Sequence, residues 1–236
     1  MSGLKIALWS LWAPVRALAE AADQRRFVWP LLLVTLVSVG FGALAVERVD
    51  FASPADDELV KTPDYAKMTP HEREDKIAQA VKIGVVGTFA KGALWPAFSA
   101  LASAFMLWLG FKVAGGKPGF VATFAVVAHS LLPDAVKLLA SLPALLTRAA
   151  SLSALELERL LPSNLGALLA ETTKANQLAL LSSVDLFALW SLAMLAVGMV
   201  HVARVTGLRS TVVVTVLWAS FVLVFRFALP SLMPQS

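Results

Sequence analysis

The sequence predicts an all-α polytopic membrane protein, with five transmembrane helices and an N-terminal interfacial amphipathic helix. Apolar side chains make up 58% of the 236 residues and charged side chains only 15%, and the mean hydropathy is +0.75. A soluble domain carries about 25% charged residues, whereas a helix that spans lipid needs roughly 20 mostly apolar ones. The composition therefore argues against a soluble enzyme and against a disordered chain.

Five stretches are long and apolar enough to cross a bilayer. They are residues 27–46, 92–111, 120–142, 186–205 and 211–229. The third is expected to continue past Pro133, because neighbouring helices in lipid can satisfy the backbone groups that a proline leaves unpaired. The whole chain, residues 1–236, is expected to form a single membrane domain.

Basic residues in the short connections predict the orientation of these spans. Three segments that contain only two acids, Glu20 and Asp23, hold Lys5, Arg16, Arg25, Arg26, Lys112, Lys117, Arg204 and Arg209. The positive-inside rule places such segments in the cytoplasm, so that residues 47–91 and 146–184 become extracytoplasmic. The N-terminus is then inside and the C-terminus outside. The formal charge of +4 reflects this topology and does not indicate a nucleic-acid partner.

Residues 1–26 predict an amphipathic helix on the cytoplasmic side. Apolar residues recur at three- and four-residue steps from Leu4 to Ala22, and Trp9 and Trp12 suit a membrane interface. Two interpretations stay open: the helix lies in the interface, or it packs under the bundle. The apolar run also resembles a secretory signal with a small-residue cleavage site at residues 17–19. The two tryptophans, Pro14 and the span that follows argue against cleavage.

Two capping-box patterns occur in the extracytoplasmic segments. Residues 51–70 contain three prolines and many acids and are expected to be irregular. Thr69 and Glu72 then predict a helix that starts at Pro70 and runs toward the second span. Its charged first turn lacks the paired ligands of a zinc helix. Ser153 and Glu156 predict a second, short amphipathic helix that ends near Pro162.

Ionisable residues within the spans form a candidate intramembrane polar cluster of His129, Asp134, Lys137, Asp185 and Arg226. At 1.5 Å per residue, Asp134 lies roughly 21 Å from the start of its span, at an outer level. Lys137 follows at i+3 and can pair with it. The cluster could line an outer cavity or lock helices together, and Asp185 could simply be a helix N-cap. His129 lies deeper, as a proton-relay group or as a histidine hydrogen-bonded to a neighbouring helix.

No motif in the sequence predicts an enzyme. A Walker loop, a nucleophile elbow, a dinucleotide fingerprint and a zinc helix are all missing from it, and the chain has no cysteine. The glycine-rich segment 115–119 lacks the strand and spacing of a phosphate loop and is expected to be a tight turn. We therefore predict no catalytic, cofactor-binding or metal-binding residue and no cofactor.

Two segments resemble the Yip-domain family, the Ypt/Rab-interacting-protein type of membrane protein. Residues 115–133 read GGKPGFVATFAVVAHSLLP, and residues 184–199 read VDLFALWSLAMLAVGM. The chain is most similar to the bacterial branch, which implies a five-span bundle in the cytoplasmic (inner) membrane with a cytoplasmic N-terminus. Some bacterial relatives are linked to ABC export systems, and the family offers no established catalytic residues.

The function expected from these features is that of a non-enzymatic membrane scaffold or accessory subunit. Its expected partners are the lipid bilayer and either another membrane protein, such as an ABC export system, or a second copy of the chain. The alternative is a small transporter or channel built around the intramembrane polar cluster. An intramembrane enzyme that uses His129 is a third possibility.

Overall fold

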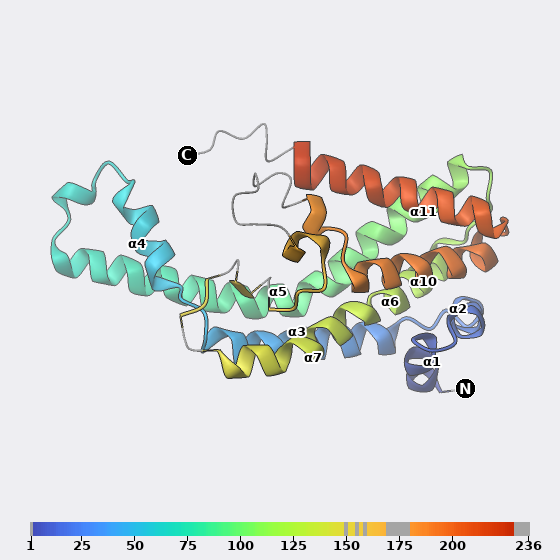
Figure 1. The fold of residues 1–236 in the computed structure, drawn as a ribbon, viewed down its shortest axis with the longest axis horizontal. Coiled ribbons are helices and arrows are strands. Elements are labelled where there is room, and N and C mark those ends of the chain that lie inside the picture. Colours follow the sequence, from blue (N-terminus) through green and yellow to red (C-terminus); the bar gives the residue numbers. More distant parts are fainter. Residues whose placement is uncertain (1, 149–150, 154–155, 158–159, 169–179, 229–236) are drawn as a thin grey trace. The chain divides into compact units, whose positions relative to one another are not determined.

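The computed structural model describes residues 2–148, 151–153, 156–157, 160–168 and 180–228. In these residues the secondary structure is helical, with two isolated β-bridges and no strand. Figure 1 shows the helices in chain order: α1 (Gly3–Ser10), α2 (Pro14–Asp23), α3 (Val28–Val46), α4 (Ala52–Val60), η1 (Tyr65–Lys67), α5 (Pro70–Val113), α6 (Phe120–Ser130), α7 (Leu132–Thr147), η2 (Leu165–Leu168), α10 (Leu186–Ala203), α11 (Gly207–Val222) and η3 (Leu223–Ala228).

Five of the helical segments are long and apolar enough to cross a membrane, which confirms the predicted all-α class. They are Val28–Val46, Pro70–Val113, Phe120–Thr147, Leu186–Ala203 and Gly207–Phe225. The second of them, α5, has 44 residues and is therefore about 66 Å long. A hydrocarbon core is about 30 Å thick, so α5 extends well beyond the bilayer.

The third span continues past Pro133, as the sequence predicted, and runs to Thr147 with a single turn residue at Leu131. α6 ends at Ser130, Leu131 forms a turn, and α7 begins at Leu132. Proline has no backbone N–H, and its ring clashes with the carbonyl group four residues earlier, here that of His129. The chain therefore turns at Leu131 and restarts its helix at Leu132, and the amide of Asp134 donates to the carbonyl of Leu131.

Residues 51–70 contain the helices α4 and η1, so the prediction of an irregular loop was wrong for this segment. The Asp50 carboxylate accepts hydrogen bonds from the amides of Ala52 and Ser53, which leaves α4 with a capped start. The Ser53 hydroxyl also donates to this carboxylate; it lowers the pKa of Asp50 most, and the two amides lower it further. Pro54 lies in the first turn, where an amide has no helical partner and a proline costs little.

The chain divides into two compact units. Unit 1 comprises residues 1–34, 96–137 and 162–236, and unit 2 comprises residues 35–95 and 138–161. The core of unit 1 gathers side chains from α2, α5, α6, α10 and α11. Its buried members are Ala22, Ala100, Ala104, Leu107, Phe111, Val126, Val127, Met199, Val202, Ala203 and Val214. Ala100 and Ala104 belong to the small-residue side of α5, and small residues let transmembrane helices approach closely.

Unit 2 has its own small core of Ala45, Leu145, Leu152 and Leu160. The Arg48 guanidinium donates to the carbonyl oxygens of Leu145, Leu146 and Arg148, at distances of 2.9–3.1 Å. A positive charge is favourable at this position because the carbonyl groups at the C-terminus of α7 have no helical partners.

The predicted capping box at the start of α5 is confirmed. The Glu72 carboxylate accepts hydrogen bonds from the Thr69 amide at 2.7 Å and from its hydroxyl at 2.9 Å, and the Thr69 hydroxyl accepts from the Glu72 amide. These bonds to Thr69 lower the pKa of Glu72. The Ser153–Glu156 box forms in the same way, but residues 154–155 and 158–159 of the helix predicted there lie outside the described residues.

Acidification is expected to loosen the start of α5. Because the folded pKa of Glu72 is below its unfolded value near 4.5, the box contributes fully above that value. Its contribution is lost as the pH falls through the folded pKa. Hydrogen exchange, corrected for intrinsic rates, should show reduced protection of the Glu72 and Arg73 amides in acid. Glu72→Ala, which removes the acceptor side chain, should show the same reduction already at pH 7, and protection that is equal in the two proteins at pH 7 would contradict this.

Candidate functional site

The N-terminal segment forms two helices, α1 and α2, where the sequence predicted one amphipathic helix. Pro14 is the first residue of α2, and the backbone of Ala13 before it is non-helical. A proline disfavours the helical conformation of the preceding residue, which breaks the segment there. The predicted apolar side is therefore divided, because Leu18 and Ala22 are buried whereas Leu8 and Val15 are exposed.

α2 packs into unit 1 against α6 and α10. A Cβ atom built on Gly198 of α10 would lie 2.5 Å from Val126 Cγ1 of α6 and 3.4 Å from Leu18 Cδ1 of α2. Only glycine allows this approach without displacement of a neighbour. At the edge of the contact, His201 Nε2 lies 2.8 Å from an Asp23 carboxylate oxygen, which links α2 to the last turn of α10. α2 is thus a packed part of the bundle.

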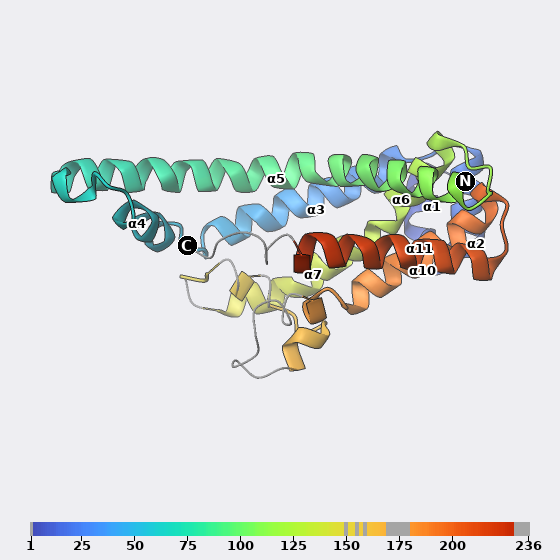
Figure 2. The same cartoon turned by 90° about the horizontal axis from the view of Figure 1, so that it is seen from above.

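Two tight turns lie beside α1 and α2 at one end of unit 1, as both views show (Figures 1 and 2). The α5–α6 turn contains Gly115 with a φ of +80°, which confirms the predicted tight turn. The amide of Lys117 donates to the carbonyl of Ala203 at the end of α10, which joins this turn to the α10–α11 turn. We call this end, with α1, α2 and both turns, the basic end.

A second polar site of unit 1 lies at the start of α10 and is centred on Asp185, which is 4% exposed. One carboxylate oxygen accepts from the Phe187 and Ala188 amides and so caps α10. The other accepts from Lys137 Nζ at 3.0 Å and from the Ser163 hydroxyl. Burial alone would raise the pKa of the carboxyl group, but these hydrogen bonds lower it. Asp185 thereby holds together α7, the segment before η2 and the start of α10.

The structure brings together part of the predicted polar cluster. Lys137 forms its ion pair with Asp185, and Asp134 lies within electrostatic range of both on the exposed side of α7. The Arg226 backbone belongs to η3, whereas its side chain lies outside the described part of the structure. Three of the five predicted residues therefore share one site.

His129 lies in the last turn of α6, and its side chain is fully buried. Its Nδ1 lies 2.8 Å from the Ala125 carbonyl of its own helix, not of a neighbouring one. Its Nε2 has no hydrogen-bond partner among the described residues, and neither does the buried hydroxyl of Ser191 in α10. His129 thus offers one buried polar atom that the fold does not use.

The sequence did not predict two of the contacts that organise unit 1. Ser163 joins the Asp185 site from 22 residues away, and Asp23 reaches His201 across 178 residues. No local pattern links such pairs, although the N-cap role of Asp185 follows from its position before an apolar run. Among the described residues, no group of three or more His, Asp or Glu residues is placed to hold a metal ion.

The fold and these contacts define an all-α, multi-pass membrane protein in which polar residues join the ends of the spans. A family model for the Yip1 domain matches residues 9–228, and the chain belongs to the Yip1-domain family. Comparison with curated proteins and with solved structures gives no match.

Proposed function

We propose that this protein is a non-enzymatic membrane scaffold or accessory subunit that acts through protein partners or through membrane organisation. The observation that carries the proposal is that the central carboxylate of unit 1, that of Asp185, is taken up entirely by structural hydrogen bonds. The Asp185 carboxylate is fully occupied by a helix cap, an ion pair and a hydroxyl group. Its four hydrogen bonds serve structure, and such a carboxylate is poorly available for chemistry.

The outer surface of the spans supports the same proposal. In the part of α5 that belongs to unit 1, Phe98, Leu101 and Phe105 recur at three- and four-residue steps and are 62%, 52% and 48% exposed. They form an apolar stripe that lipid or another membrane helix can cover. We propose that a membrane-protein partner, such as an ABC export system or a second copy of this chain, covers the stripe.

Photo-crosslinking tests this partner. A benzoylphenylalanine at position 101 should yield a discrete protein adduct, and the Phe98→Ala/Phe105→Ala background should reduce its yield severalfold. The matched control is the same probe at position 216 of α11, where Val216 is 57% exposed and lipid is the expected neighbour. Lipid adducts alone at position 101, with no protein adduct, would contradict the partner.

We further propose a bacterial inner membrane location with the N-terminus in the cytoplasm and the C-terminus outside. The basic end carries eight basic residues and only two acids, which favours the cytoplasmic side. The chain has no cysteine, so a single introduced cysteine shows on which side of the membrane its position lies, with no labelling of native cysteines. An impermeant maleimide should label Asp57→Cys in intact cells and Lys117→Cys only after permeabilisation. The reverse pattern would contradict the orientation.

A transporter or channel is the second candidate, and it is favoured by the buried Nε2 of His129, which has no hydrogen-bond partner among the residues that the structure describes. A buried polar atom without a hydrogen bond lowers the stability of a membrane protein, so its presence in a span favours a functional role. If the protein conducts ions or protons, proteoliposomes should show a flux that His129→Phe abolishes while thermal stability is kept. Wild-type proteoliposomes without flux above empty liposomes would contradict this candidate.

A further inference from the structure

The helix α1 has one face built into the protein and one face left outside it. Ile6, Ala7 and Ser10 are fully buried. On the other face Leu8 is 51%, Trp9 36% and Trp12 80% exposed. These three residues lie on one side of α1, about one turn apart, so α1 packs on the protein through this side and its other side chains point outward.

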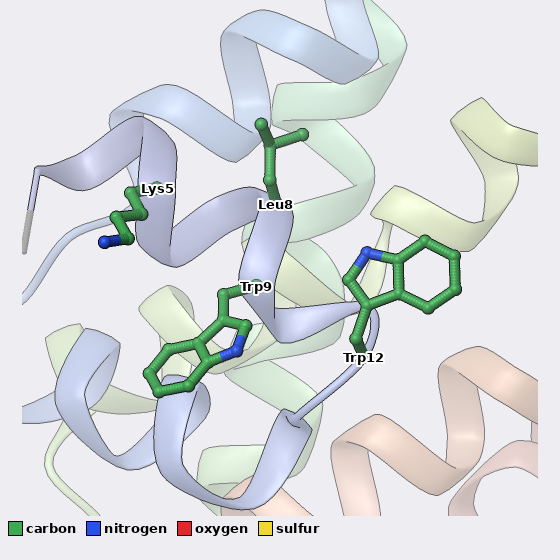
Figure 3. Close-up of a pocket in the computed structure, with 4 residues that line it drawn as sticks. All are labelled: Lys5, Leu8, Trp9 and Trp12. Atoms are coloured by element: carbon green, nitrogen blue, oxygen red, sulfur yellow. The ribbon is translucent and has the colours of Figure 1, made fainter.

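The outward side chains line a shallow groove. Lys5, Leu8, Trp9 and Trp12 surround a volume of about 310 Å³, with Lys5 near the start of α1 and Trp12 just past its end (Figure 3). Tryptophan is enriched where headgroups meet acyl chains, because its ring is apolar and its N–H is polar. A lysine beside it can lay its methylene groups on apolar surface and direct its ammonium group to water or phosphate.

Contacts within unit 1 fix α1 against the bundle. A Cβ atom on Gly3 would lie 2.5 Å from Trp29 Cδ1, so α1 starts in close contact with the beginning of α3. α1 also packs on α2, which is itself fastened to α10 near Gly198. The exposed face therefore lies at the level where the spans end, and lipid headgroups lie at that level.

The positive charge of the basic end favours anionic phospholipids over zwitterionic ones. Lys5 lines the groove, and the basic end to which α1 belongs carries eight lysines and arginines against two acids. Basic residues close to a bilayer attract anionic phospholipids, and the attraction adds up over several residues. A zwitterionic headgroup would gain little from the same charges.

We propose that the outward face of α1 docks on the anionic phospholipid surface of the bilayer that the helices cross. The indole rings of Trp9 and Trp12 lie at the boundary between headgroups and acyl chains, and Lys5 contacts lipid phosphate. α1 is then the lipid-binding element, and α2, which packs against α1, connects it to α6 and α10. This role is independent of any protein partner.

Spin labelling in nanodiscs tests the proposal. A label on Leu8→Cys in the full chain is compared in phosphatidylcholine alone and in a mixture with phosphatidylglycerol. With the anionic lipid, the label should gain accessibility to oxygen and lose accessibility to a nickel chelate, so that the ratio of oxygen to nickel accessibility rises. Lys5→Glu should abolish this rise, because it replaces an attractive charge at the anionic surface with a repulsive one. High salt should also lower the ratio.

Lys82→Glu makes the same change of charge at an exposed lysine of α5 in unit 2, and it should leave the ratio unchanged. Trp9→Ala/Trp12→Ala should abolish docking in both lipids while the melting temperature is kept. Equal docking in the two bilayers would overturn the role of anionic lipid. A label at position 8 that neither oxygen nor the nickel chelate reaches, together with crosslinking of the position 8 cysteine to another copy of the chain, would overturn lipid as the occupant.

Discussion

Gly198→Ala is expected to lower the apparent Tm by roughly 2–12 °C. The new methyl group would lie 2.5 Å from Val126 Cγ1, which is closer than two carbon atoms can approach. Overpacking of this kind costs about 1–3 kcal/mol, and each kcal/mol shifts the Tm by about 2–4 °C in a chain of this size. The measurement is thermal unfolding in detergent, followed by the loss of monodisperse protein in size-exclusion chromatography.

A matched control separates overpacking from a general effect of alanine. Gly40 also lies inside a transmembrane helix, but a Cβ atom built on it meets nothing within 4 Å. Gly40→Ala should therefore leave the Tm unchanged or raise it slightly, because alanine favours the helix. Equal effects at the two glycines would contradict the close approach of α10 to α6.

A compensating substitution identifies the neighbour. Val126→Ala removes the methyl groups that the new side chain would meet, so the double variant should be more stable than the sum of the single effects predicts. Coupling energies of about 0.5–3 kcal/mol are typical of residues in contact. Strict additivity would mean that Gly198→Ala acts elsewhere.

Asp185→Ala is expected to be the most destabilising change at the polar site. It removes the N-cap of α10, worth about 1 kcal/mol, and it leaves Lys137 without its carboxylate partner. Lys137 is 30% exposed and Asp185 6% by side chain, so the ion pair should contribute about 1–3 kcal/mol, between typical exposed and buried pairs. Equilibrium unfolding of Asp185→Ala, Asp185→Asn and Lys137→Met measures these contributions.

The control for the ion pair is Lys61→Met. Lys61 pairs with Glu58 at 2.8 Å, but the two side chains are 54% and 75% exposed. Solvent screens such a pair, so we expect no measurable change in stability. If Lys137→Met were equally silent, the Asp185 site would not hold α7 to α10.

The contribution of Asp185 should also depend on pH. Because the folded pKa lies below the ordinary value of 3.8, the stabilisation is fully present above that value and is lost as the pH falls through the folded pKa. The difference in unfolding free energy between the wild type and Asp185→Asn should therefore be constant near neutral pH and should narrow below about pH 4.

Several elements could be predicted from local sequence. The capping box of Thr69 and Glu72 placed the start of α5 correctly, because a cap depends on residues only three positions apart. Other elements could not. The prolines in residues 51–70 suggested a loop, but the chain places Pro54 in a first turn and the segment becomes helical. The turn at Leu131 could not be predicted, because it depends on whether neighbouring groups donate hydrogen bonds to the backbone carbonyls that Pro133 leaves unpaired.

The candidate site was only partly predictable for the same reason. The sequence placed Asp134, Lys137 and Asp185 at one level, since depth follows from the helical rise. It suggested Asp134 as the partner of Lys137, whereas the ion pair joins Lys137 to Asp185 of another helix. Spacing along a helix reveals which residues share a face, but it does not reveal which helix that face meets.

The sequence by itself determined the membrane class, the five spans and the concentration of basic charge at one end, because length, hydropathy and charge are local properties. The tertiary structure decided which residues are in contact, such as Gly198 with Val126 and Asp185 with Ser163. It also decided which face of α1 stays exposed. In a membrane protein both lipid and protein interior are apolar, so hydrophobicity does not distinguish a packed face from an exposed one. Steric fit and paired polar groups make that distinction, and both require contacts between residues far apart in the chain.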